Sequence, residues 1–137
     1  MKAAVFHGPK DVRIEEVAEP GDPAGGEVVL EVLRGAICGT DAAEWDHGPV
    51  LCKPPVVLGH EFVGRVAAVG SDVEALRIGD RVVSGAGISC GRCAWCSAGR
   101  TNLCAEYRTL GLQVDGGLTE LVTSPADICR LVPDGVD

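Results

Sequence analysis

The chain has 137 residues, with 20 Asp or Glu against 12 Lys or Arg, so its formal net charge is −8 at pH 7. This length fits one domain, and 46% hydrophobic with 23% charged residues is typical of a folded globular protein. The acidic balance argues against binding to nucleic acid or to an anionic membrane, which requires a basic surface. No apolar run reaches the ~20 residues of a membrane span. The N-terminal segment becomes charged before the apolar region of a secretory signal could form. We therefore expect a cytoplasmic protein.

Short strands separated by turns are predicted along most of the chain. In chain order they are Lys2–His7, Val12–Val17, Glu27–Leu33, Glu61–Val69, Gly79–Val83, Leu118–Thr123 and Ile128–Val132. Between them, Gly8–Asp11 predicts a hairpin turn, and Cys38–His47 is compatible with one or two helical turns. Because no longer helix separates the strands, the pattern predicts a mainly β fold, as a small barrel or sandwich.

A loop over residues 85–108 carries four cysteines in the pattern C-x2-C-x2-C-x7-C, namely Cys90, Cys93, Cys96 and Cys104. Each two-residue gap lets a tight turn aim two sulfurs at one point. Four thiolates form a closed tetrahedral zinc site, which is structural because no coordination position stays open. A disulfide-linked loop and an iron–sulfur cluster are the alternatives, but the chain lacks a secretory signal and the fourth spacing differs from that of ferredoxins.

Two further motifs stand at predicted strand ends. Cys38-Gly39-Thr40-Asp41 follows one strand, and Gly59-His60-Glu61 precedes another. A thiolate and an imidazole from two strand ends can share one metal ion, and two protein ligands leave an incomplete site, as catalytic zinc sites do. The alternative is a small core cysteine and a hydrogen-bonded histidine. Cys52 and Cys129 have no partner at metal-ligand spacing, and we expect the first in a loop and the second in the core.

The stretch from Gly59-His60-Glu61 through Gly64, Gly70 and Val73 resembles the signature of zinc-containing alcohol dehydrogenases. The order and spacing of the motifs resemble those of the medium-chain dehydrogenase/reductase superfamily: Cys38–Asp41 before this stretch, then Gly79–Val82 and the four-cysteine loop after it. The resemblance covers nearly the whole chain. Through Cys-Gly-Thr-Asp and Gly99–Cys104 it is closest to the polyol, butanediol and threonine dehydrogenase branch.

The resemblance implies a GroES-like, partly open β-barrel over residues 1–137, the N-terminal catalytic domain of such an enzyme. It implies that Cys38 and His60 are ligands of a catalytic zinc ion, with Glu61 behind the metal and able to replace another ligand. Asp41 is expected to accept a hydrogen bond from the far ring nitrogen of His60. Thr40 is expected to hydrogen-bond the substrate oxygen.

The implied activity is the NAD- or NADP-dependent oxidation of a secondary alcohol or polyol to a ketone, or the reverse. The implied cofactors are one structural and one catalytic zinc ion together with the nicotinamide, and the whole enzyme is expected to be a homodimer or homotetramer. Many relatives have a histidine at the outer end of the proton relay, where this chain has Ala43. Glu44 or His47 could replace it, although a solvated His47 is the simpler interpretation. Trp45 is expected either to face the substrate or to pack.

No G-x-G-x-x-G motif for a dinucleotide occurs in the sequence. By the resemblance, the third zinc ligand is a Cys or Glu beyond Asp137. We therefore expect a domain that lacks its Rossmann partner and is inactive alone. The alternative is a stand-alone, zinc-stabilised GroES-like module used for binding or assembly.

Overall fold

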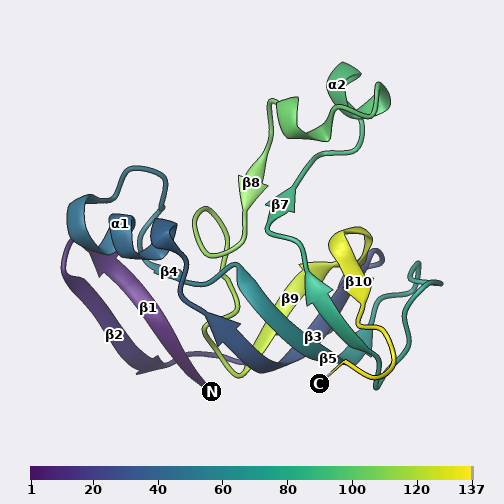
Figure 1. Ribbon diagram of the computed structural model, residues 1–137, viewed down its shortest axis with the longest axis horizontal. Coiled ribbons are helices and arrows are strands. Elements are labelled where there is room, and N and C mark those ends of the chain that lie inside the picture. Colours follow the sequence, from purple (N-terminus) through teal and green to yellow (C-terminus); the bar gives the residue numbers. More distant parts are fainter. Residues whose placement is uncertain (137) are drawn as a thin grey trace.

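The computed structural model describes residues 1–136, so Asp137, the last residue of the expected domain, lies outside the described residues. Three antiparallel sheets with few short helices make up the molecule, and a small lobe projects from its body (Figure 1). This mainly β architecture with open sheets confirms the fold class predicted from the sequence. Within residues 1–136, no helix combines the length and the hydropathy that a membrane crossing requires.

The largest sheet has five strands in the order β10-β6-β5-β3-β9. Its centre is the pairing of β3 (Glu27–Ala36) with β5 (Glu61–Val69), two long Val-containing strands. Alternate residues of β5 are buried, whereas in β3 the consecutive residues Val28, Val29 and Leu30 are buried. The register shifts after Val29 and after Val32, and such bulges bend a strand and increase its twist. The remaining strands are β6 (Arg81–Ser84), β9 (Leu121–Pro125) and β10 (Cys129–Leu131).

The second sheet has the order β2-β1-β4 and lies beside helix α1 (Gly39–His47). Its strands are β1 (Lys2–Gly8), β2 (Asp11–Glu16) and β4 (Val56–Val57). The β1–β2 hairpin was predicted from the sequence and is confirmed. At its turn, Lys10 has φ 61°, and its N–H donates to the carbonyl of Trp45 in α1 at 2.7 Å. The hairpin is thereby joined to the helix.

An irregular segment over residues 110–119 connects the two sheets. The N–H groups of Gly116, Gly117 and Leu118 donate to carbonyls of residues 57–59, and the Ala4 N–H donates to the carbonyl of Leu118. The strand expected over Leu118–Thr123 therefore starts only at Leu121, because the residues before it bond to the other sheet. This segment holds the residues just before β5 in place.

The core has one large and two smaller apolar clusters. The large one packs residues from the five-stranded sheet and from the loops that cover it: Val28, Leu30, Phe62, Val66, Leu76, Val82, Leu110, Val122 and Cys129. Phe6, which is fully buried, centres a second cluster that includes Cys52 and Leu58. Cys129 is thus in the core and Cys52 in a loop, both as expected, but the Cys52 side chain is buried as well.

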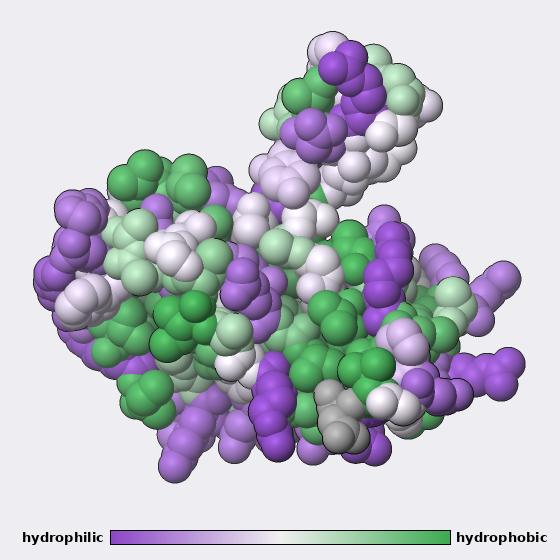
Figure 2. All heavy atoms as spheres, viewed as in Figure 1, coloured by the Kyte–Doolittle hydropathy of each residue, from purple (hydrophilic) through white to green (hydrophobic). Residues whose placement is uncertain are grey.

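The projecting lobe is joined to the body by two short paired strands, β7 (Gly87–Ile88) and β8 (Arg108–Thr109). It contains α2 (Ala94–Ser97) and η1 (Thr101–Leu103), neither of which has a buried residue. Figure 2 shows that the lobe stands clear of the body. With so little apolar burial, the lobe needs another source of stability.

Removing the Phe6 side chain tests the assignment of the second cluster. Phe6→Ala should lower the free energy of unfolding by about 3–5 kcal/mol, because it leaves a cavity at a fully buried site. Ile14→Ala on the neighbouring strand is the matched control; Ile14 is 72% exposed, so the loss should stay below about 1 kcal/mol. Urea unfolding of both variants with zinc present measures the difference. Equal losses would contradict the assignment.

Candidate metal centres

The ends of two paired strands bring Cys38 and His60 together. In the β3–β5 ladder, Ala36 lies opposite Glu61. Cys38 comes two residues after the end of β3, and His60 immediately precedes β5. Both residues therefore lie at the same end of this strand pair. The Cys38 sulfur, a ring nitrogen of His60 and a carboxylate oxygen of Glu61 all lie within 4.8 Å of one another. The structure thus brings Cys38 to the adjacent residues His60 and Glu61, which are distant from it in the sequence.

Gly59 determines the direction in which the chain enters His60. Its φ of +97° lies in the left-handed region that favours glycine. A Cβ at this position would lie 2.6 Å from Cγ of Leu118 and 2.9 Å from its backbone nitrogen. Any side chain here would push His60 away from the segment that supports it.

Cys38 is the N-cap residue of α1. Its N–H donates to Oδ2 of Asp41, the third residue of the helix, at 2.9 Å. This bond fixes the Cys38 backbone at the start of the helix. Thr40 Oγ1 lies 3.7 Å from Cys38 Sγ. The helix start therefore places a thiol and a hydroxyl side by side.

The other carboxylate oxygen of Asp41 faces His60. Oδ1 of Asp41 and Nδ1 of His60 are 3.7 Å apart, and neither atom has a hydrogen-bond partner among the described residues, although both are buried. The expected Asp41–His60 hydrogen bond is therefore not formed at this distance, which exceeds hydrogen-bond length. Buried unpaired polar atoms are costly. Their position beside a thiol fits a zinc site, because a ligating histidine usually gives its second ring N–H to a carboxylate.

Glu44, one of the two relay candidates, is instead bound to the loop that follows its helix. Its carboxylate accepts the backbone N–H groups of Val50, Leu51 and Cys52 at 3.0, 2.8 and 3.1 Å. Burial opposes its ionisation, but these three hydrogen bonds outweigh burial and lower the pKa of Glu44 below its ordinary value. His47, the other candidate, has a 76% exposed side chain beside Asp46.

Trp45 packs against the hairpin turn. The ammonium group of Lys10 lies 3.9 Å from the centre of its ring, and Lys10 also pairs with Asp46 on the same helix. This cation–π contact accounts for the position of the ring. Of the two expectations for Trp45, the packing role is the one that these contacts support.

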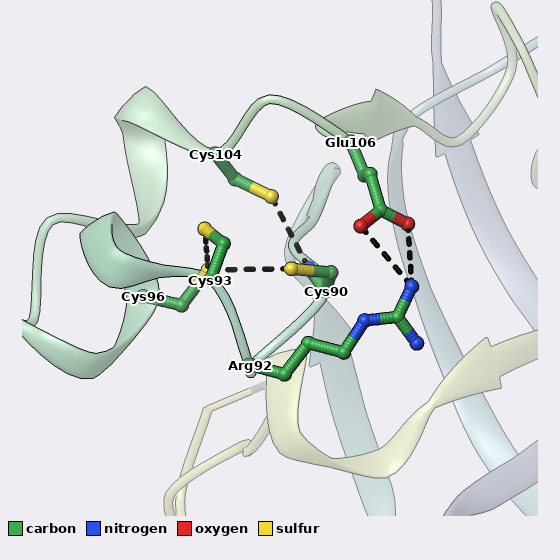
Figure 3. A network of polar contacts seen from close by, with 6 residues as sticks. All are labelled: Cys90, Arg92, Cys93, Cys96, Cys104 and Glu106. Carbon is green, nitrogen blue, oxygen red and sulfur yellow. Dashed lines mark hydrogen bonds and ion pairs between the residues drawn. The ribbon is translucent and has the colours of Figure 1, made fainter.

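The four cysteines of the lobe point toward a common centre (Figure 3). All four sulfurs lie within 4.8 Å of one another; Cys93 and Cys96 are 3.5 Å apart, and Cys90 and Cys96 are 4.0 Å apart. A zinc ion bound at about 2.3 Å to four sulfurs requires sulfur–sulfur distances of about 3.8 Å. The Cys90 N–H also donates to the Cys104 sulfur at 3.3 Å. All seven cysteines of the chain are free thiols, so the disulfide alternative is not supported.

The lobe thiols differ in how readily they ionise. A hydrogen bond from the Cys96 backbone lowers the pKa of Cys93 to about 6, whereas desolvation raises the pKa of Cys96 to about 11. Cys93 is therefore the thiol of this pair that ionises more readily, and a bound cation favours ionisation of the others. Outside the cluster, Arg92 makes two hydrogen bonds to Glu106 across the base of the lobe (Figure 3).

The two remaining cysteines are inert by position. Cys52 is buried, and burial together with the nearby Glu44 charge raises its pKa to about 12. Cys129 is buried beside Ser124, and burial raises its pKa as well. Neither thiol belongs to a metal-ligand group among the described residues.

Residues 24–134 match the family described as "Alcohol dehydrogenase GroES-like domain". The chain is 38% identical over 140 residues to sorbitol dehydrogenase of Bacillus subtilis (strain 168), covering 99% of this chain and 39% of that protein. It is 39% identical over 142 residues to L-threonine 3-dehydrogenase of Stenotrophomonas maltophilia, covering 99% and 41%. A solved alcohol dehydrogenase from Escherichia coli CFT073 in complex with NADH has a TM-score of 0.90 and 38% identity, covering 100% and 40%.

This chain spans about two fifths of the length of these relatives. The matched range contains both the Cys38–His60 group and the four-cysteine lobe. The family match, the relatives and the architecture agree with one another over nearly the whole chain. The chain therefore belongs to the zinc-type, medium-chain alcohol dehydrogenases, and it carries their GroES-like domain.

Proposed function

We propose that this chain is the catalytic-zinc domain of an NAD(P)-dependent dehydrogenase that interconverts a secondary alcohol or polyol and the corresponding ketone. The observation that carries the proposal is the convergence of Cys38, His60 and Glu61 within 4.8 Å, outside the four-cysteine lobe. Relatives named sorbitol dehydrogenase and L-threonine 3-dehydrogenase, and a solved relative in complex with NADH, support this class of substrate and cofactor.

The two groups differ in the kind of zinc site that they can form. The lobe offers four thiolates, which fill a tetrahedral shell and make a structural site. The second group offers one thiolate and one imidazole, with Glu61 as an exchangeable third ligand, and so leaves room for a substrate. Because Nδ1 of His60 faces Asp41, Nε2 is the nitrogen available to the metal.

We call the group of Cys38, His60 and Glu61 the open centre. Zinc bound there would polarise the alcohol oxygen and lower its pKa, and a nicotinamide would accept the hydride. The Thr40 hydroxyl is both a donor and an acceptor, so it can take the proton of the substrate hydroxyl and pass it on. Oδ2 of Asp41 accepts the Cys38 N–H, and Oδ1 lies 3.7 Å from Nδ1 of His60, where a small shift on metal binding would let it accept the ring N–H. Since its carboxylate is fully engaged by the loop, Glu44 is not the group that accepts the proton from Thr40.

Metal content separates the two centres. The purified chain should hold two zinc ions, measured by plasma mass spectrometry. Cys104→Ser should lose the lobe ion only, because three thiolates and a hydroxyl bind zinc more weakly, and His60→Ala should lose the open-centre ion only. Cys129→Ser, at a core cysteine outside both groups, is the control and should keep both. A single ion that Cys104→Ser removes would contradict the proposal and support a stand-alone structural module.

Turnover should require a nicotinamide-binding domain in addition to this chain. The 137-residue chain alone should give no steady-state NAD(P)H signal with any alcohol. In a protein that joins the chain to such a domain, Thr40→Ala should lower kcat by about 10²–10⁴-fold through loss of proton transfer. Thr40→Ser, which keeps the hydroxyl, should retain most of the activity. Turnover by the isolated chain, or full activity of Thr40→Ala, would contradict these roles.

A further inference from the structure

We propose that Glu44 is a positioning residue for the open metal centre, fixing the helix that carries Cys38 and Thr40 relative to the strand end that carries His60. This inference rests on the function proposed above. Sequence reasoning considered Glu44 only as a proton acceptor. The structure instead places its side chain, 3% exposed, between α1 and the loop over residues 48–55.

Helix α1 has no apolar face with which to pack. Its two buried side chains are Asp41 and Glu44, which lie on the same side because they are three residues apart. Asp41 faces Cys38 and His60, and Glu44 faces the loop. Lys10 joins the helix to the hairpin turn, but on the side of the metal centre two carboxylates hold it, where a surface helix normally relies on hydrophobic contacts.

Helix stability alone does not favour a glutamate at position 44. The residue lies in the last turn of α1, where the helix dipole is unfavourable to a negative charge. Its burial is compensated by the three backbone N–H groups of Val50, Leu51 and Cys52, which it accepts with both oxygens. Gly48 makes room for this arrangement, since a Cβ there would lie 2.7 Å from Oε2 of Glu44.

The loop that Glu44 holds reaches the backbone beside His60. The Cys52 sulfur lies 3.8 Å from the carbonyl oxygen of Gly111. Gly111 is packed so closely on Gly59 that a Cβ on it would lie 2.6 Å from the Gly59 nitrogen. A continuous set of contacts thus runs from Glu44 through Cys52 and Gly111 to Gly59, the residue before His60. It connects the helix side of the metal centre to its strand side.

Without the Glu44 carboxylate, α1 would be held at the open centre by Asp41 alone. The distance between the Cys38 sulfur and the His60 ring would then vary, and a metal ion would bind a less ordered pair of ligands. The four-cysteine lobe shares none of these contacts, so its affinity should not change. The lobe is therefore an internal reference in the same molecule.

The test loads the 137-residue chain with cobalt, whose absorption reports ligand geometry, and measures the affinity of each site by chelator competition. Glu44→Ala and Glu44→Gln should weaken binding at the open centre by about 10–100-fold, as loss of a group that orients metal ligands does. Its cobalt bands should broaden while those of the lobe stay unchanged. Hydrogen exchange should speed up at the amides of residues 50–52. Gln should retain part of the effect, because it keeps one acceptor oxygen.

Two controls separate positioning from general destabilisation. Asp46→Asn removes the exposed carboxylate that pairs with Lys10 on the same helix and should leave both affinities unchanged, because the backbone bond from Lys10 to Trp45 remains. Val122→Ala destabilises the large cluster at a position paired with Leu30, toward the end of β3 opposite to Cys38, and should not change the cobalt spectrum beyond the loss of folded protein. Wild-type affinity in Glu44→Ala, or an equal spectral change in Val122→Ala, would overturn the inference. Failure of the wild-type chain to bind a second metal would instead overturn the proposed function, and this inference with it.

Discussion

The antiparallel pairing of β3 with β5 is the constraint on which the open centre depends. Because Ala36 lies opposite Glu61, the end of β3 and the start of β5 are side by side, and Cys38 and His60 meet there. A register slip of one residue would turn His60 and the apolar side chains of β5 to the opposite face. Phe62 and Val66, buried in the large core cluster, oppose such a slip. The packing of the sheet therefore also fixes the ligand geometry.

The two centres draw on different sources of order. The proposed open centre would stand on the five-stranded sheet and on a polar helix whose two buried side chains are the carboxylates Asp41 and Glu44. The lobe has almost no apolar core, and its short helix and turns are arranged around four sulfurs. A closed thiolate site suits a part of the chain that cannot be stabilised by burial, since metal binding supplies folding free energy directly. An open site requires the opposite, a scaffold that keeps its shape without a full ligand shell.

Much of this was predictable from sequence. The alternation over Glu27–Leu33, the Val- and Ala-rich run Glu61–Val69 and the turn at Gly8–Asp11 are local patterns, and the structure has the predicted strands and hairpin there. The four-cysteine spacing predicts one metal group, and the structure brings the four sulfurs within 4.8 Å of one another. The role of Glu44 was not predictable, because its partners are backbone N–H groups of a loop, which leave no side-chain signature. The late start of β9 and the burial of Cys52 were missed because segment 110–119 bonds across to the other sheet and the loop of Cys52 packs on it. The distance of 3.7 Å between Oδ1 of Asp41 and Nδ1 of His60 was not predictable either, because a sequence pattern does not specify distances between atoms.

The central claim is that the chain holds a second zinc ion in a mixed sulfur and nitrogen site. X-ray absorption at the zinc edge of Cys104→Ser, prepared with one ion per chain, tests it most directly, because the lobe ion no longer contributes. The account predicts one sulfur at about 2.3 Å together with nitrogen and oxygen ligands at about 2.0–2.1 Å. A shell of three sulfurs at about 2.3 Å with one oxygen would place the remaining ion in the damaged lobe and contradict the account.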